Sequence, residues 1–244
     1  MGAVENDVRI IDGRDGIRVG LLEEIYAEVL QPSLGHDELQ DPWWDAPSGS
    51  DTLPYELVLA AVGSSGAALG ALIAEEFPIS KTLLLAYLGV RPEWRGKGIG
   101  TRLMQEAARR WYPTLDVQLV VAEIDDPRCH VPSLGQDPTD RVHFYARLGG
   151  KALAAPYWQP RVREEAPRVY HMFLCVFDAK AGVANERECD GAVLRAFLRE
   201  YLEVAEDPGV LAGDPEVDLM LDTWFGASRI GLVPLERYAE LPSS

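Results

Sequence analysis

The sequence predicts a mixed α/β (α+β) fold in which helices flank a central sheet. Strand-like apolar runs alternate with helix-like amphipathic runs over the first 178 residues. Three strand-like runs form a meander before a glycine-rich turn, and helices alternate with strands after it. We therefore expect one α/β domain over residues 1–178. Residues 179–244 change to a mainly helical pattern and are expected to form a C-terminal extension.

Periodicity and turn residues predict the N-terminal elements. An apolar run predicts a strand over residues 8–11. The i, i+4 repeats of Leu21, Ile25 and Val29 predict a helix that Asp15 caps and that ends near residue 30. Further strands are expected over residues 57–62, 67–77 and 83–90, and a helix over residues 100–112. The run 83–90 is almost wholly apolar, which is typical of a central strand.

The later elements follow from one strong capping signal and several apolar runs. Asp137 is expected to cap a helix with Pro138 in its first position, and Gly149 to end it. Strands are predicted over residues 117–124, 151–153 and 169–177, with a loop over residues 125–136. In the extension we expect helices over residues 188–204 and 215–225 and a short strand over residues 230–233.

Composition excludes several classes of protein. With 244 residues, 47% hydrophobic and 25% charged, the chain has ordinary globular values. No apolar run approaches the ~20 residues of a membrane span, and the N-terminus lacks the pattern of a signal peptide, so we expect a cytoplasmic protein without membrane contact. The net charge of −16 argues against nucleic acid as a partner. It suits cationic small molecules or basic peptides, although an acidic soluble surface is the stronger explanation.

The three cysteines predict no metal site and no disulfide framework. An odd count without a C-x-x-C pair or a secretion signal indicates reduced thiols. Cys129 stands beside His130, but no second pair of ligands has the spacing of a metal site.

The most informative stretch runs from Arg95 to Thr101, where the strand 83–90 gives way to a helix. Three glycines there let the backbone approach an anion, and the first N–H groups of the helix carry partial positive charge. A Walker A loop is excluded, because no Lys-Ser or Lys-Thr follows a glycine at the required spacing. The G-x-G-x-G spacing and the preceding meander also fit a Rossmann fingerprint poorly.

Two motifs resemble those of the GNAT superfamily of N-acyltransferases, and they follow one another along the chain in the same order as in that family. Arg95, Gly98 and Gly100 occupy the defined places of the signature [RQ]-x-x-G-x-[GA], which is the acetyl-CoA loop of that family. Phe144-Tyr145-Ala146-Arg147-Leu148-Gly149 is similar to its second signature, F-Y-x-x-x-G. The resemblance covers about residues 8–177 in element order. It implies a GNAT fold, in which two parallel strands splay apart to admit the pantetheine arm.

The resemblance implies acetyl-CoA as co-substrate and no metal. Backbone groups of Leu88, Gly89 and Val90 would pair with the pantetheine amides, and the Val90 N–H would stabilise the oxyanion. The pyrophosphate would lie on the N–H groups of a run of residues in the loop: Arg95, Gly96, Lys97, Gly98, Ile99, Gly100 and Thr101. The side chains of Arg95 and Lys97 would add charge, although Lys97 is equally compatible with simple solvation.

The resemblance also implies an acid, and the strand pattern suggests a base. Tyr145 matches the family's general acid, which protonates the leaving thiolate; its alternative role is packing. Glu123 lies in the apolar run 120–124, where a carboxylate is costly without a function or a partner, and is the preferred base. The alternatives are Glu75 or Glu76 as base, or a buried Glu123 that merely pairs with Arg128 or His130.

The acceptor is expected to be a primary amine, more specifically a small molecule. The segment 31–53 carries Trp43 and Trp44 among acidic residues, a combination that suits a cation with an apolar body. Glu75, Tyr87 and Asp125 are further candidates for the acceptor site, and Tyr87 fits the core equally well. The open alternatives are a non-catalytic acyl-CoA-binding module, a longer acyl group, and a protein lysine or N-terminus as acceptor. The extension packs on the core or forms a homodimer interface.

Overall fold

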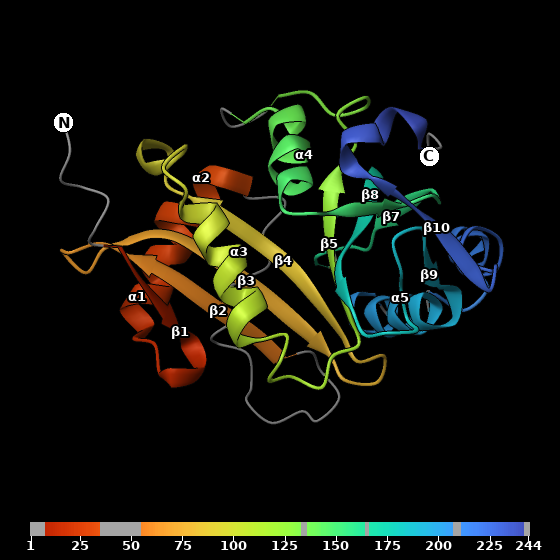
Figure 1. Cartoon of the computed structure of the whole chain (residues 1–244), viewed down its shortest axis with the longest axis horizontal. Coiled ribbons are helices and arrows are strands. Elements are labelled where there is room, and N and C mark those ends of the chain that lie inside the picture. The colour runs from red at the N-terminus through yellow and green to blue at the C-terminus, as the bar shows by residue number, and fades with distance from the viewer. Residues whose placement is uncertain (1–7, 35–54, 133–135, 164–165, 207–210, 242–244) are drawn as a thin grey trace. The chain divides into compact units, whose positions relative to one another are not determined.

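The computed structural model describes residues 8–34, 55–132, 136–163, 166–206 and 211–241 (Figure 1). The chain divides into two compact units, each described separately below. Unit 1 comprises the described residues of Met1–Asp51 together with Tyr55–Glu75 and Leu85–Asp116. Unit 2 comprises Glu76–Leu84 and the described residues of Val117–Ser244. The strands form a mixed sheet with flanking helices, as predicted.

Unit 1 is built on four neighbouring strands in the order β1-β2-β3-β4. β1 (Arg9–Asp12) pairs antiparallel with β2 (Tyr55–Val62). β3 (Ala68–Phe77) and β4 (Thr82–Val90) continue the predicted meander and pass into unit 2 at one end. Gly66 (φ +85°) provides the left-handed conformation that the tight turn between β2 and β3 needs. All four strands were predicted to within two residues at each end.

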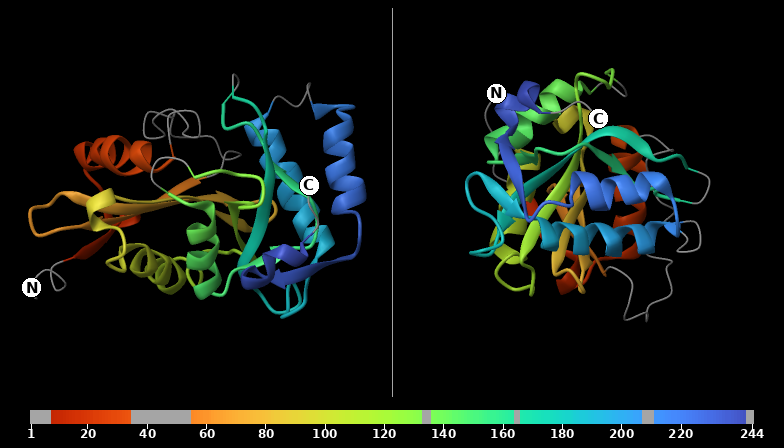
Figure 2. Two further views of the ribbon diagram at one scale, coloured as in Figure 1. Left: turned by 90° about the horizontal axis from the view of Figure 1, so that it is seen from above. Right: turned by 90° about the vertical axis from the view of Figure 1, so that its right-hand side faces the viewer.

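Helices cover both faces of the unit 1 sheet, as the left view of Figure 2 shows. On one face, α1 (Val19–Glu24) continues through a π-helical turn, Ile25–Leu30, into α2 (Gln31–Leu34). Leu21, Ile25, Val29 and Leu30 pack there on apolar side chains of β2 and β3, which confirms the predicted apolar stripe. On the other face lies α3 (Ile99–Arg110).

The predicted cap of the first helix was wrong. Asp15 lies in a separate 3-10 turn, Gly13–Asp15, and α1 begins after Arg18 without a side-chain cap. The acid that is buried in this region is Asp12. Its carboxylate accepts hydrogen bonds from Arg14 and from Trp111 Nε1 (3.1 Å). The tertiary contact with Trp111, which lies 99 residues away, could not be inferred from the local pattern.

Unit 2 contains the strand order β4-β5-β8-β6-β10-β9, with β7 paired to β8. The first residues of β4, Thr82–Leu84, pair in parallel with β5 (Leu119–Asp125). β5 pairs antiparallel along its length with β8 (Val169–Ala179). The remaining strands are β6 (Lys151–Leu153), β7 (Tyr157–Gln159), β9 (Glu188–Asp190) and β10 (Arg229–Pro234). β7 and β9 were not predicted: residues 157–159 were assigned to no element, and residues 188–190 were assigned to the helix that follows them.

The helices of unit 2 begin at strong N-caps. Asp137 caps α4 (Pro138–Arg147) by accepting from the Thr139 N–H at 2.8 Å, which confirms the capping prediction. Asp190 caps α5 (Gly191–Ala205), so this helix begins three residues later than predicted. Asp214 caps α7 (Pro215–Asp218), which a π-helical turn extends over Leu219–Trp224, and a 3-10 segment spans Leu235–Glu240. α5 and the Leu219–Trp224 turn lie side by side (Figure 2).

The region after residue 178 contributes strands as well as helices to unit 2. β10 pairs antiparallel with β6, with Val233 opposite Ala152. On its other side β10 pairs with β9. β10 confirms the strand predicted over residues 230–233, and through it the extension continues the sheet. The predicted domain boundary at residue 178 stays a prediction.

Candidate functional site

The glycine turn of unit 1 links β4 to α3 through two left-handed residues. After β4 ends at Val90, a 3-10 turn spans Pro92–Trp94. Gly96 (φ +73°) and Gly98 (φ +79°) then adopt conformations that side chains with a Cβ rarely reach. Gly98 is also the N-cap of α3 and has no side chain to satisfy the first N–H groups of the helix.

A row of backbone donors follows from this geometry. Among the described residues, the N–H groups of residues 96–101 donate to no acceptor. The Arg95 N–H is committed to the Pro92 carbonyl (3.2 Å), so the free row begins at Gly96. Consecutive free N–H groups at a helix start form a cradle for an anion such as a phosphate, and the helix dipole adds to their attraction.

The two basic side chains of the turn have different surroundings. Arg95 Nε donates to the Val90 carbonyl (3.1 Å) and its Nη2 donates to Ser33 Oγ (3.4 Å), so this side chain holds the turn against the end of β4. Lys97 is exposed and its Nζ lies 4.3 Å from the centre of the Trp94 ring. Lys97 therefore retains a charge accessible to a bound anion.

The end of β4 carries the three predicted pantetheine contacts. Leu88 and Val90 are half-buried and alternate with the buried Tyr87 and Gly89. A Cβ on Gly89 would approach the Val29 carbonyl to 3.1 Å, so glycine there allows close packing of the first helical segment. This glycine has a structural reason of its own, which is independent of any ligand.

In unit 2, Glu123 lies on β5 and its carboxylate accepts three hydrogen bonds. Tyr157 Oη donates to Oε1, while Gln159 Nε2 (2.7 Å) and Tyr201 Oη (3.2 Å) donate to Oε2. The partners suggested by the sequence have other contacts: Arg128 binds Asp126, and His130 Nε2 faces the carbonyls of residues 170 and 171. The described partners of Glu123 are thus neutral donors.

Burial raises the pKa of Glu123 to about 7, and the hydrogen bonds from Tyr157, Gln159 and Tyr201 lower it in part. A carboxyl group with this pKa is about half ionised at neutral pH, where it can both accept and release a proton. Burial also raises the pKa of Tyr157 well above its usual value, so its phenol remains a donor to Glu123.

Tyr145 lies on α4 in an apolar cluster with Ile124 and Phe177. Its ring centre is 5.6 Å from that of Phe177 and 5.0 Å from that of Phe144. Burial raises the pKa of Tyr145 to about 12, so the phenol is protonated at neutral pH. Because successive strand residues face opposite ways, Ile124 and Glu123 point to opposite faces of β5, and Tyr145 lies on the Ile124 side.

The other predicted acceptor residues are scattered. Glu75 and Tyr87 are buried in unit 1, and Asp125 of unit 2 accepts a hydrogen bond from Arg141. Trp43 and Trp44 lie outside the described residues. The sequence did not single out Tyr157, Gln159 or Tyr201 as partners of Glu123, because the first two lie on a three-residue strand and Tyr201 belongs to an apolar helical stripe.

The described part of the chain shows neither a cluster of metal ligands nor a membrane-spanning helix. No group of three or more His, Cys, Asp or Glu side chains there is arranged to hold a metal ion. None of the described helices combines the length and apolarity needed to span a bilayer.

A comparison with protein families identifies the segment that carries both signatures. Residues 55–149, less than half of the chain, match the family model of the acetyltransferase (GNAT) domain. This segment forms a GNAT acetyltransferase domain. It includes the glycine turn, Glu123 and Tyr145, whereas Tyr157, Gln159 and Tyr201 lie beyond its end. The chain thus carries the domain of an acyltransferase.

Similar solved structures include other GNAT proteins. A protein assigned to this family from Bacteroides thetaiotaomicron is 18% identical, with 69% of this chain and 85% of that chain covered and a TM-score of 0.48. The spermidine/spermine N-acetyltransferase SpeG from Vibrio cholerae is 14% identical; the match covers 71% of this chain and 94% of that chain, with a TM-score of 0.45. A GNAT acetyltransferase from Elizabethkingia anophelis with acetyl-CoA bound is 12% identical; the match covers 71% of this chain and 99% of that chain, with a TM-score of 0.43. No curated protein matches the chain.

Proposed function

We propose that the protein is an N-acetyltransferase that transfers an acetyl group from acetyl-CoA to a primary amine of a small molecule. The observation that carries the proposal is the row of N–H groups at residues 96–101 that donate to no described acceptor and lie within the GNAT domain. Such a row fits the pyrophosphate of coenzyme A. The charge of Lys97 supplements it, and the family resemblance adds pairing of the pantetheine arm with the backbone of residues 88–90.

In the proposed reaction, Glu123 accepts a proton from the ammonium form of the acceptor. An amine has a pKa of ~10 and must be neutral to attack, so a carboxylate with a pKa of about 7 assists at neutral pH. The amine nitrogen then bonds to the thioester carbonyl carbon, and the carbon–sulfur bond breaks as the tetrahedral intermediate collapses. The attacking nitrogen releases one proton as the amide forms. The thiolate of coenzyme A leaves and takes up one proton, so the products are the amide and the free thiol.

Tyr145 is the proposed partner of the leaving sulfur. Its phenol is protonated, which permits donation to the thiolate. An ordinary thiol has a pKa of ~8.5, so a phenol with a pKa of about 12 donates a hydrogen bond to the thiolate more readily than it gives up its proton. The raised pKa therefore favours stabilisation of the sulfur over complete proton transfer.

The acidic balance of the chain supports a cationic acceptor. A net charge of −16 attracts cationic amines over distances set by the ionic strength. A basic protein acceptor would benefit from the same field, so the acceptor class needs a direct comparison. Thiol release should be measured over a panel of small amines and over lysine-containing and N-terminal peptides.

Acetyl-CoA binding, measured by isothermal titration calorimetry, tests the donor side. Gly98→Ala should weaken binding, because it strains the left-handed residue in the middle of the proposed cradle. Gly66→Ala is the matched control, since Gly66 has a similar φ of +85° in the turn between β2 and β3. Absence of acetyl-CoA binding at millimolar concentration would refute the proposal. Binding without thiol release from any amine would identify a non-catalytic module.

A further inference from the structure

The three described donors to the Glu123 carboxylate all follow the GNAT segment in sequence. Tyr157 and Gln159 come from β7, and Tyr201 comes from α5. All three lie after residue 149, where the family match ends. The surroundings of the proposed base thus depend on a part of the chain that the family match does not cover.

Tyr201 is fixed by aromatic contacts on α5. Its ring centre lies 5.7 Å from that of Phe197 in a stacked arrangement and 5.4 Å from that of Phe77 in an edge arrangement. The side chain is only 7% exposed. With the ring held in this way, the hydroxyl lies 3.2 Å from Glu123 Oε2.

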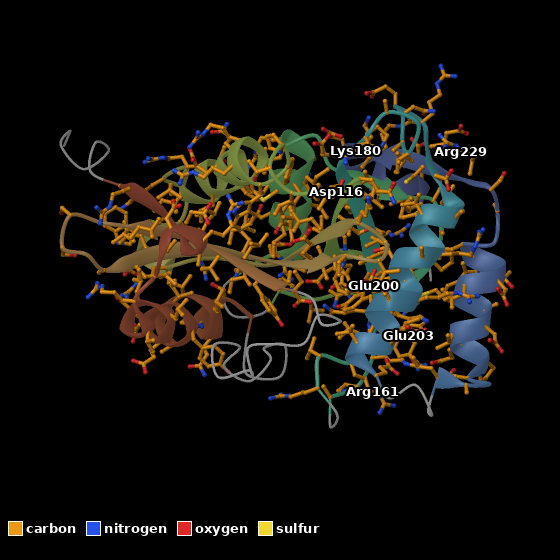
Figure 3. The ribbon with its side chains drawn as sticks, turned by 90° about the horizontal axis from the view of Figure 1, so that it is seen from below. Asp116, Arg161, Lys180, Glu200, Glu203 and Arg229 are labelled. Carbon is orange, nitrogen blue, oxygen red and sulfur yellow. The ribbon has the colours of Figure 1, made fainter. Side chains whose placement is uncertain are left out.

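The residue before Tyr201 anchors the same turn of the helix. The Glu200 carboxylate accepts hydrogen bonds from the N–H groups of Ile79 (3.0 Å) and Ser80 (2.7 Å) in the turn between β3 and β4. Glu200 is buried, whereas Glu203, on the same helix, is exposed (Figure 3). A buried carboxylate that accepts two backbone N–H groups is costly to displace, so α5 has a defined position in unit 2.

We propose that Tyr201 is a positioning residue for catalysis: its hydroxyl orients the Glu123 carboxylate and stabilises its ionised form, so that α5 completes the site of proton acceptance. The proposal rests on the proposed role of Glu123 as the base. Donors to a carboxylate favour its charged form, and burial opposes them. Without the Tyr201 hydroxyl, Oε2 would retain only Gln159 as a donor among the described residues.

Few groups other than Tyr201 influence the titration of Glu123. Among the described residues, the titratable side chains that donate to it are Tyr157 from β7 and Tyr201 from α5, and Gln159 is neutral. From β8, the residue opposite Glu123 in the register is the apolar Leu174. Among the described residues, no charged side chain shifts the pKa of Glu123. Removal of one hydroxyl should therefore have a measurable effect.

The test measures the titration of Glu123 in the full-length protein by NMR, with a ¹³C label at the side-chain carboxyl carbon of glutamate. The Glu123 resonance is assigned by its loss in Glu123→Gln. Tyr201→Phe keeps the ring and should raise the midpoint by about one pH unit, because a hydrogen bond to a charged group is among the stronger ones. Tyr170→Phe is the control, because the Tyr170 hydroxyl binds Glu216 instead.

Activity provides the second measurement. In Tyr201→Phe, the acid limb of the kcat/KM profile should shift to higher pH by the same amount as the NMR midpoint. The ionised fraction at pH 7 would then fall from about one half to about one eleventh, and kcat/KM at pH 7 by about fivefold. Tyr170→Phe should change neither the midpoint nor the limb.

The outcomes separate this proposal from the proposed function. An unchanged NMR midpoint in Tyr201→Phe overturns the role of Tyr201, whatever the activity. If the midpoint moves but the acid limb does not, Glu123 is not the base, and the positioning role is overturned together with that assignment. The wild-type protein gives a check that does not depend on folding of the variant: the ζ-carbon resonance of Tyr201 should report the same midpoint as Glu123, and a pH-independent resonance would contradict the proposal.

Discussion

Replacement of Glu123 by Gln tests the proposed base most directly. The amide has nearly the same shape as the carboxylate and can still accept from Tyr157, but it cannot take up a proton at neutral pH. General-base assistance typically contributes a factor of 10²–10⁴, so we expect kcat to fall by roughly 10²-fold or more. Affinity for acetyl-CoA should stay unchanged, because the proposed phosphate cradle lies in the glycine turn.

The pKa of Glu123 sets the expected pH dependence. With a pKa of about 7, the ionised fraction rises from about one eleventh at pH 6 to about ten elevenths at pH 8. The kcat/KM of the wild-type protein should therefore rise about tenfold over this interval. The Glu123→Gln variant has no such titration and should lose this limb of the profile.

Folding stability gives an independent measure of the same group. The folded-state pKa of about 7 lies above the ordinary value of 4.5, so the folded state holds this proton more tightly than the unfolded chain. The resulting stability is complete below pH 4.5 and is lost as the pH rises to about 7. The loss is at most about 3 kcal/mol for a difference of this size. In Glu123→Gln this contribution to the pH dependence should be absent.

The assays are initial rates of thiol release from pH 5.5 to 9 and urea unfolding from pH 4.5 to 8. Glu203→Gln serves as the control, because it makes the same chemical change at an exposed position of α5. Wild-type turnover in Glu123→Gln, or an acid limb that persists in it, would show that another group accepts the proton.

Three further outcomes are expected. Gly98→Ala should weaken acetyl-CoA binding at least tenfold in calorimetry, whereas Gly66→Ala should leave it unchanged; equal effects would point to general destabilisation. Tyr145→Phe should lower kcat more than coenzyme affinity in steady-state and binding assays, and unchanged turnover would remove Tyr145 from the reaction. Arg168→Leu should cost about 3–5 kcal/mol in urea unfolding, because it removes the cation paired with the buried Glu206. Arg237→Leu removes the exposed Arg237–Glu240 pair and should have a much smaller effect; equal effects of the two variants would refute this distinction.

Local signals in the sequence were sufficient for much of the fold. The Asp137-Pro138 cap, the glycine turn before α3 and the strands of the meander depend on interactions within a few residues, so their sequence patterns predicted them. The cap of α1 was misplaced, because Asp15 belongs to a separate 3-10 turn and α1 begins after Arg18 without a side-chain cap. β7 and β9 were missed, because their pairing with β8 and β10 rather than their own three residues makes them strands.

For the candidate site, the sequence by itself determined the donor side: a glycine turn at the junction of β4 and α3, with spacing that allows a row of free N–H groups. It also marked Glu123 as a carboxylate in an apolar strand. Only the tertiary structure decided what surrounds that carboxylate, because Tyr157, Gln159 and Tyr201 lie 34 to 78 residues away along the chain. The pKa of Glu123 is about 7 because burial raises it and hydrogen bonds from these distant donors lower it in part. A local sequence pattern cannot predict the balance between these two effects.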